Sequence, residues 1–250
     1  MGRLKIIGLL AWAAAAPVTN VAPAQTPELA EAWLDARAAI RDGAYDLTVE
    51  RRLRRYALYP YLEAESIIAT LRRPELLSEA TERADDFLRE HADTAIEDAF
   101  RRDLLLALAE RELWEEFVRF YSPVVANESR ECEYLSARVR LGQTSDLAGL
   151  VERRWLTPRR LDADCEPAFE WLRRHGTLDD ELTARRVAML LENGQSGFAR
   201  IIAQRLPDAA AEAYRQWAQM LDEPLASIAA IADGSAVPLH QDIVAAVWAR

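Results

Sequence analysis

Histidine, cysteine and lysine are scarce in this chain of 250 residues, and their scarcity argues against several kinds of site. There are two cysteines, a single lysine at position 5, and three histidines, which are His91, His175 and His240. The histidines are isolated from one another, and neither cysteine lies beside one in a nucleophile motif. No HExxH, CxxC or acidic-loop pattern occurs. We therefore expect no metal site, no bound cofactor and no cysteine nucleophile.

An excess of positive charge is absent as well. The formal net charge is -10, because 41 acidic residues outnumber 31 basic ones. Nucleic-acid binding draws most of its affinity from cationic contacts with phosphates, so an acidic chain of this kind is a poor candidate for it.

Long apolar runs are missing except at the beginning of the chain. There Arg3 and Lys5 precede an apolar run over residues 6–18, and Ala22-Pro23-Ala24 matches a signal-peptidase site. Residues 1–24 are therefore predicted to be a cleaved signal peptide, and its removal would move the charge from -10 to -12. An uncleaved membrane anchor is the competing interpretation, but the run is short for a span of about 20 residues and contains Pro17. No later stretch is apolar enough to span a membrane, so we expect the exported mature protein to be soluble.

The apolar residues recur with a helical period, and no convincing alternating strand pattern occurs. The first predicted helix covers residues 27–42, with Leu29, Trp33 and Ile40 on one face and Gly43 just beyond its end. Further helices are predicted over residues 47–56, 61–71, 78–91, 94–110, 114–121, 131–141, 145–155, 165–174, 179–192, 197–205, 208–220, 224–232 and 238–250.

Short connections between these helices predict antiparallel neighbours, which must stack to bury their apolar faces. We therefore expect residues 25–250 to form one all-α domain, a right-handed superhelix or solenoid of antiparallel helix pairs that is TPR-like. No strict 34-residue repeat is present. The last predicted helix ends at Arg250 without a closing helix. That end indicates a truncated product, a fragment or a surface that a partner covers.

A series of landmarks runs along the predicted helices. It comprises Tyr56-Ala-Leu-Tyr59-Pro60-Tyr61-Leu62-Glu63, Leu104-Leu-Leu-Ala-Leu-Ala109, Trp114-Glu-Glu-Phe117, Cys132 followed by Gly142-Gln143, Trp155-Leu156, and Asp164-Cys165-Glu166 with Phe169 and Trp171-Leu172. In this order, over roughly residues 30–205, the landmarks resemble the superhelical U domain of the soluble lytic murein transglycosylases. Glu166 stands where that family more often has Asp.

The resemblance implies a role in peptidoglycan turnover in the periplasm. The family cuts glycan strands with one glutamate, which acts as general acid and then as base in a lysozyme-like domain. Its E-S-x-F and G-L-M-Q motifs are not found here, because Glu65-Ser66 and Glu128-Ser129 lack the aromatic residue and the later motif. We expect Glu65 to be an exposed surface charge and assign no catalytic residue. The chain is then a scaffold that acts only with a separate catalytic domain or protein.

Two cysteines in an exported chain are expected to be oxidised, which predicts a disulfide between Cys132 and Cys165. A disulfide that closes a loop of this length is expected to stabilise the fold by about 3 to 4 kcal/mol, because it restricts the unfolded chain. The aromatic landmarks are expected to pack in the core, and this role is favoured over one in which they form a sugar-binding surface. These landmarks are Tyr59, Trp114, Phe117, Trp155, Phe169 and Trp171.

Arginines from successive helices are the predicted glycan-facing residues, namely Arg101, Arg102, Arg138 and Arg140. The resemblance makes peptidoglycan glycan strands the expected partner. The main alternative is a TPR-like periplasmic module that binds proteins through a groove. A small enzyme with an unrecognised site is a second alternative, but no set of nucleophile, base and oxyanion stabiliser is evident.

Overall fold

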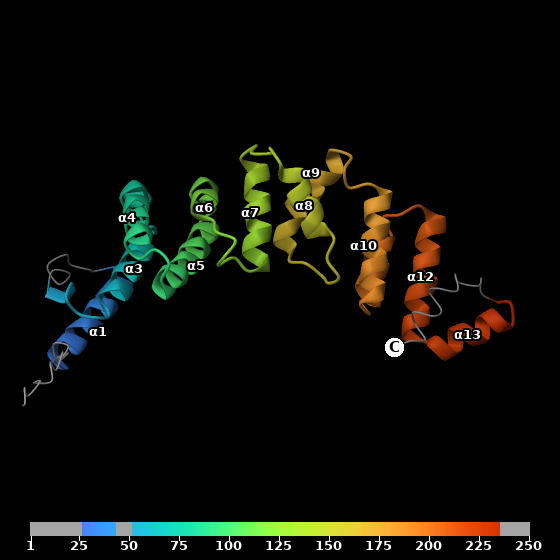
Figure 1. The fold of residues 1–250 in the computed structure, drawn as a ribbon, viewed down its shortest axis with the longest axis horizontal. Helices are drawn as coiled ribbons and strands as arrows, with labels where there is room; N and C mark the ends of the chain where they lie inside the picture. Colours follow the sequence, from blue (N-terminus) through green and yellow to red (C-terminus); the bar gives the residue numbers. More distant parts are fainter. Residues whose placement is uncertain (1–26, 44–51, 236–250) are drawn as a thin grey trace, which may run out of the picture. The chain divides into compact units, whose positions relative to one another are not determined.

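The computed structural model describes residues 27–43 and 52–235, and these residues form helices joined by turns and short loops, with no strand among them. They fall into two compact units, residues 1–65 and 66–250, whose boundary lies within α3 (Figure 1). The first unit contains α1 (Pro27–Arg41) and the start of α3 (Tyr59–Thr70). The predicted all-α fold is confirmed.

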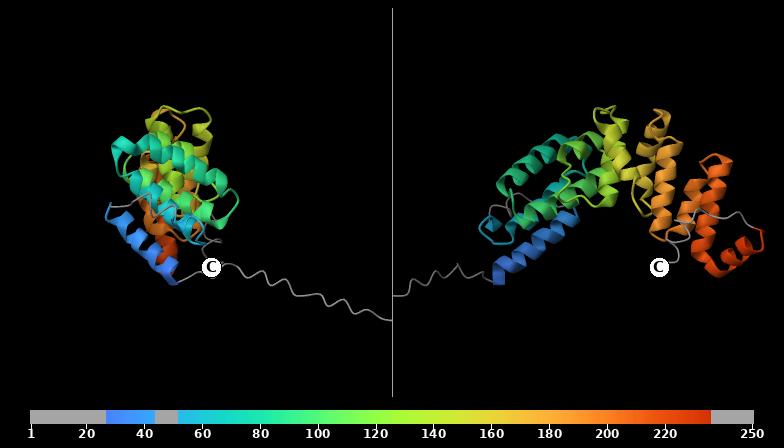
Figure 2. Two further views of the ribbon diagram at one scale, coloured as in Figure 1. Left: turned by 90° about the vertical axis from the view of Figure 1, so that its left-hand side faces the viewer. Right: turned by 45° about the vertical axis from the view of Figure 1, so that its right-hand side comes forward.

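After the end of α3, the described residues of the second unit form ten α-helices and two 3-10 turns. They are η1 (Pro74–Leu76), α4 (Leu77–Glu90), α5 (Ala95–Glu110), α6 (Trp114–Phe120), α7 (Glu128–Arg140), α8 (Leu147–Trp155), η2 (Ala163–Cys165), α9 (Glu166–Arg174), α10 (Asp180–Glu192), α11 (Ser196–Ala203), α12 (Asp208–Asp222) and α13 (Pro224–Ala232). Their main contacts join elements that are near neighbours in the chain, such as α5 with α6 and α11 with α12. The helices α10 and α12 also lie side by side, as orange and red ribbons in Figure 2. This neighbour-by-neighbour packing is that of a helical repeat array.

Polar side chains at the helix starts explain several boundaries. Thr94 accepts a hydrogen bond from the Glu97 amide, Asn127 from the Arg130 amide, and Asp179 from the Leu182 amide. Each satisfies an amide that has no partner inside its helix. At the other end of α7, Gly142 adopts φ 68°, a left-handed conformation that costs glycine little.

The predicted helices within the described residues differ from the observed ones by at most three residues at either end. The largest difference is at α7, which begins at Glu128 and not at the predicted residue 131. The capping bond of Asn127 starts the helix early. Helix α8 begins two residues later than predicted, because Asp146 before it takes a positive φ of 57°. The predicted signal peptide, residues 47–51 of the predicted 47–56 helix and the predicted helix over 238–250 lie outside the described residues.

One hydrophobic core extends from Cys132 on α7 to Ala218 on α12. The core prediction for the aromatic landmarks is confirmed for four side chains, which are Tyr59, Phe117, Trp155 and Phe169. It is wrong in part for Trp114 and Trp171, which are half-buried. Among the residues described, no helix is long and apolar enough to cross a membrane.

Candidate functional site

A disulfide holds the turn before α9 against α7. Cys132 on α7 is bonded to Cys165 at the end of η2, as predicted, and both residues are fully buried. Beside the bond, the Ser136 hydroxyl donates to the carbonyl oxygen of Asp164 at 2.5 Å, and the Ser129 hydroxyl donates to the Asp164 carboxylate at 3.0 Å. Covalent and polar contacts together fix the start of α9.

Trp155, at the end of α8, is the aromatic centre of this region. Its indole nitrogen donates to the carbonyl oxygen of Leu182 at 3.3 Å, so α8 is tied to α10. The ring of Phe169 on α9 meets it edge to face, with 4.9 Å between centroids. The disulfide and Trp155 therefore bring α7, α8, α9 and α10 into one packed group of helices, which we call the disulfide module.

The four predicted glycan-facing arginines differ in what they contact. Arg138 is buried, and it donates to the carbonyl oxygens of Gln143 at 3.1 Å and Ser145 at 2.6 Å and to the Asp146 carboxylate at 2.9 Å. Its charge therefore holds the turn between α7 and α8, and the surface role expected for Arg138 is wrong.

Arg101 is half-buried on α5. Its guanidinium donates to the Glu97 carboxylate at 2.6 Å and to the carbonyl oxygen of Phe120 at 3.1 Å, which ties α5 to the end of α6. Arg102 and Arg140 are exposed, and the guanidinium of Arg140 lies 5.2 Å from the centre of the Trp114 ring. Only these two of the four present their charge to the surface.

The two Glu-Ser pairs also have structural partners. Glu65 was expected to be an exposed charge, but it is half-buried and accepts from the Arg37 side chain at 2.6 and 2.8 Å within the first unit. Glu128 lies in the first turn of α7, where its carboxylate accepts from Arg159 at 2.8 Å. Each carboxylate is therefore one half of an ion pair with an arginine.

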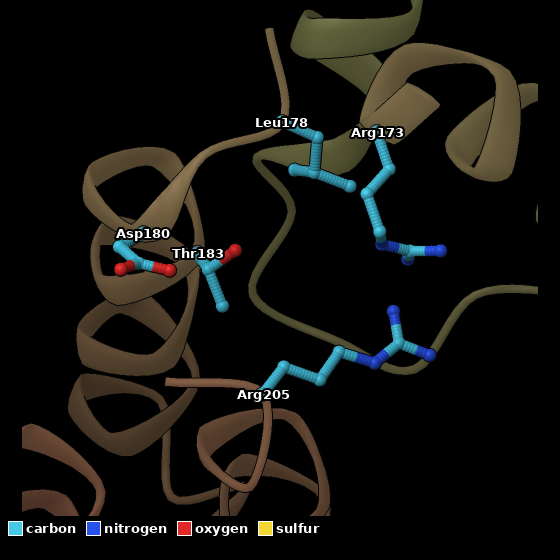
Figure 3. Close-up of a pocket in the computed structure, with 5 residues that line it drawn as sticks. All are labelled: Arg173, Leu178, Asp180, Thr183 and Arg205. Carbon is cyan, nitrogen blue, oxygen red and sulfur yellow. The ribbon is translucent and has the colours of Figure 1, made fainter. Parts of the chain in front are cut away.

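Two adjoining cavities open beside the disulfide module, and Arg205 lines both. The larger has a volume of about 420 Å³ and is lined by Arg173, Leu178, Asp180, Thr183 and Arg205 (Figure 3). Figure 3 shows the guanidinium groups of Arg173 and Arg205 pointing toward one another. Two cations that face each other attract an anion.

The smaller cavity has a volume of about 240 Å³ and lies at the α8 to α9 connection and α11. Arg186 of α10 lines it and is only 2% exposed. Its guanidinium carbon lies 4.1 Å from the ring centre of Trp155, 5.6 Å from that of Phe169 and 5.5 Å from that of Phe198. Three aromatic faces thus surround one buried cation, an arrangement that gives cation–π attraction.

Burial and the charge of the nearby Arg205 lower the pKa of Arg186 to about 10, while Glu166 acts in the opposite direction. The guanidinium is therefore still charged at neutral pH. A charge taken from water in this way is costly without an ionic partner.

Sequence reasoning missed Arg186, although a signal for it exists. Leu182, Arg186 and Leu190 follow one another at intervals of four along α10, and all three are buried. An arginine in the apolar stripe of a helix must be buried with the stripe. The cavities themselves depend on turns distant in the sequence and have no local signature.

No protein-family model matches the chain, and no curated protein matches it in sequence. Solved structures do match. The 70-kDa soluble lytic transglycosylase from Escherichia coli is 21% identical, with a TM-score of 0.63 over 80% of this chain and 32% of that one. The 70-kDa soluble lytic transglycosylase in complex with bulgecin A is 21% identical, with a TM-score of 0.61 over 78% of this chain and 32% of that one.

An inactive mutant of lytic transglycosylase Slt from Pseudomonas aeruginosa is 21% identical, with a TM-score of 0.56 over 86% of this chain and 40% of that one. The chain has a soluble lytic transglycosylase-like fold. It spans about a third of the length of the first two structures and 40% of the third. At this identity the likeness concerns the fold.

Proposed function

We propose that this chain is a periplasmic helical scaffold for peptidoglycan turnover. In this proposal it binds the glycan strands of peptidoglycan, does not cleave them by itself, and acts with a separate catalytic domain or protein. The observation that carries the proposal is the fold likeness to three lytic transglycosylase structures over 78% to 86% of the chain. Residues 1–24 direct export as a cleaved signal peptide.

The buried disulfide supports the periplasmic part of the proposal. Disulfides persist in oxidising compartments such as the bacterial periplasm and are rare in the cytosol. Cys132 and Cys165 are fully buried and bonded, and no free cysteine occurs in the described residues. A reducing compartment would leave this region without its crosslink.

Arg102 and Arg140 are the arginines proposed to face glycan. Both are exposed, and they stand on α5 and α7, two helices that contact each other. Arg140 lies over the half-buried ring of Trp114, so a cation and part of an aromatic surface occur together. Binding sites commonly combine aromatic side chains with a few placed polar groups.

Sedimentation with purified peptidoglycan sacculi tests this function. The mature chain is incubated with sacculi, the pelleted protein is measured, and soluble fragments are identified by mass. We expect the chain to pellet with sacculi and to release no anhydro-muropeptides. Release would contradict the scaffold role, and a chain that stays in the supernatant would contradict peptidoglycan binding and favour a protein-binding module.

A double variant tests the proposed glycan-facing arginines. Arg102→Gln with Arg140→Gln is expected to lower the pelleted fraction. The matched control, Arg89→Gln with Arg215→Gln, removes the same charge from other exposed sites with side chains 74% and 53% accessible. An equal loss in both variants would show that net charge, and not this surface, governs binding.

A further inference from the structure

Arginine is the commonest charged residue in the lining of the two adjoining cavities beside the disulfide module. Their lining includes four arginines, Arg160, Arg173, Arg186 and Arg205, against three carboxylates, Asp162, Glu166 and Asp180. The protein as a whole has the opposite balance, with a formal net charge of -10. Arg173 also forms an ion pair with Glu170, so the charges here nearly balance. Clustered guanidinium groups can still hold the carboxylate of a ligand.

Two of these arginines have buried nitrogens without a hydrogen-bond partner. They are Nε of Arg186 and Nη2 of Arg173. The Arg173 guanidinium pairs with Glu170 through its other terminal nitrogen, Nη1, while the Glu166 carboxylate oxygen lies 3.9 Å from Nη2, beyond hydrogen-bond distance. Buried donors in folded proteins are nearly always satisfied, so two of them beside shared cavities indicate that an acceptor belongs there.

The position of Glu166 indicates that a carboxylate is a suitable acceptor for Arg173 and Arg205. One oxygen of its carboxylate lies 3.9 Å from Arg173 Nη2 and 3.4 Å from Arg205 Nη2, so a single oxygen lies between the two arginines. Its side chain is 56% exposed and its contacts are long. A second carboxylate entering the larger cavity can make shorter contacts with the same guanidinium groups, which are well suited to bidentate binding of carboxylates.

We propose that these cavities bind the C-terminal carboxylate of a short peptide. Arg173 and Arg205 hold the carboxylate where they face each other (Figure 3), and Arg186 supplies a fixed positive charge from the adjoining cavity. Water can satisfy the unpaired nitrogens but cannot neutralise the charge.

The remaining walls favour a peptide over a bare carboxylate ion. The volumes of about 420 and 240 Å³ far exceed the needs of one carboxylate group. Leu178 lines the larger cavity, while Phe198 and Ile202 line the smaller one. These apolar side chains can pack against small apolar side chains such as that of alanine. A short chain that ends in a carboxylate matches both features.

This inference rests on the proposed function only for the natural source of the ligand, since the short peptides of peptidoglycan carry free carboxylates. The chain would then contact the peptide portion of the polymer through these cavities. The glycan portion would lie on the surface near Arg102 and Arg140, which belong to other helices of the same unit.

Calorimetric titration with alanyl-alanine tests the inference, with its C-terminal amide and acetate as comparison ligands. We expect saturable binding of the free dipeptide and binding at least about tenfold weaker for the amide, because one charge-assisted contact is worth about that factor. Acetate should bind more weakly than the dipeptide. No dipeptide binding, or equal binding of the amide, would overturn the carboxylate assignment, and acetate binding as tight as the dipeptide would overturn the peptide assignment.

Arginine variants test whether the dipeptide binds in these cavities. Arg173→Gln and Arg205→Gln are each expected to weaken dipeptide binding about tenfold or more. Arg215→Gln on α12, an exposed arginine paired with Glu212, should leave it unchanged. Circular dichroism checks that each variant is folded. Unaltered binding in both Arg173→Gln and Arg205→Gln would overturn the proposal.

The two proposals fail separately. Dipeptide binding by a chain that does not pellet with sacculi would support the carboxylate site and contradict the peptidoglycan function. Pelleting with sacculi without dipeptide binding would contradict the carboxylate site and leave the peptidoglycan function supported.

Discussion

Two buried arginines in the same helical unit have opposite surroundings. Arg138, at the end of α7, donates to two carbonyl oxygens and to the Asp146 carboxylate. Arg186, on α10, contacts three aromatic rings and has a buried Nε without an acceptor. Both sit on amphipathic helices, and both are at most 9% exposed. They differ in whether the protein itself supplies their partners.

The pKa values of the two groups reflect that difference. Burial lowers the pKa of Arg138, but the Asp146 hydrogen bond and the charges of Tyr134 and Asp146 outweigh it, so the pKa is raised. For Arg186, burial and Arg205 prevail and lower the pKa to about 10. A buried arginine whose partners are all internal stabilises the fold, whereas one without them leaves its charge available to a ligand.

Removing the disulfide should have the largest effect, because the loop that it closes contains the turn held by Arg138 and also Trp155, whose ring lies against Arg186. Replacing Cys132 and Cys165 together by Ala is expected to lower the free energy of unfolding by about 3 to 4 kcal/mol. Urea unfolding followed by circular dichroism measures it. A loss below about 1 kcal/mol would mean that packing alone holds both regions.

Arg138→Met should be the next largest change. It removes hydrogen bonds from a charged group to the 143–146 turn, and we expect a loss of about 2 to 3 kcal/mol in unfolding free energy. Arg140→Met is the matched control two residues later on the same helix, because its side chain is exposed, and it should stay within about 0.5 kcal/mol of the parent. Equal losses in the two variants would remove the distinction between a buried and a surface arginine on α7.

Alkaline pH should weaken the Arg138 region through Tyr121. Its ring stacks on Tyr134 with centroids 3.9 Å apart, and Tyr134 in turn lies under Arg138. Burial first, then the charges of Glu131 and Tyr134, raise the pKa of Tyr121 to about 12. Above the unfolded pKa of 10 the unfolded chain loses this proton while the folded chain keeps it. Stability therefore falls as pH rises from about 10 to about 12.

After a discount for solvent screening, this loss is on the order of 1 to 2 kcal/mol. The test compares the parent chain with Tyr121→Phe at about pH 9 and about pH 11.5. The parent should lose more unfolding free energy than the variant between the two conditions. Parallel behaviour would show that Tyr121 ionises as it does in the unfolded chain.

Arg186→Met should have the smallest effect on stability. It removes an unpaired buried charge and places an unbranched apolar side chain against three rings, so the free energy of unfolding should stay within about 1 kcal/mol of the parent or rise. Thermal and urea unfolding measure it beside Arg138→Met. A loss as large as that of Arg138→Met would show that Arg186 is a structural arginine held by its aromatic contacts.

The helices were predictable from sequence because apolar periodicity and helix-ending residues act locally. Helix α13 was predicted at its observed bounds, and α6 differs by one residue. The predicted helix starts are wrong where a single residue sets the boundary. Asn127 starts α7 early through a single hydrogen bond, and Asp146 delays α8 through its left-handed backbone.

The candidate site was less predictable, because burial of an arginine depends on residues that the fold brings near it. Nothing local distinguishes Arg138 from Arg140, yet one is buried and the other exposed. Arg205 comes from the turn after α11 and Arg173 from α9, so only the packed helices reveal that they face each other (Figure 3). The disulfide was predictable because the chain has only two cysteines and an export signal pattern.

The most direct test of the proposed function is sedimentation of the mature chain with intact sacculi at physiological ionic strength. The proposed scaffold role predicts that the chain pellets and releases no soluble muropeptides. A chain that remains in the supernatant, or one that pellets and releases anhydro-muropeptides, would contradict it.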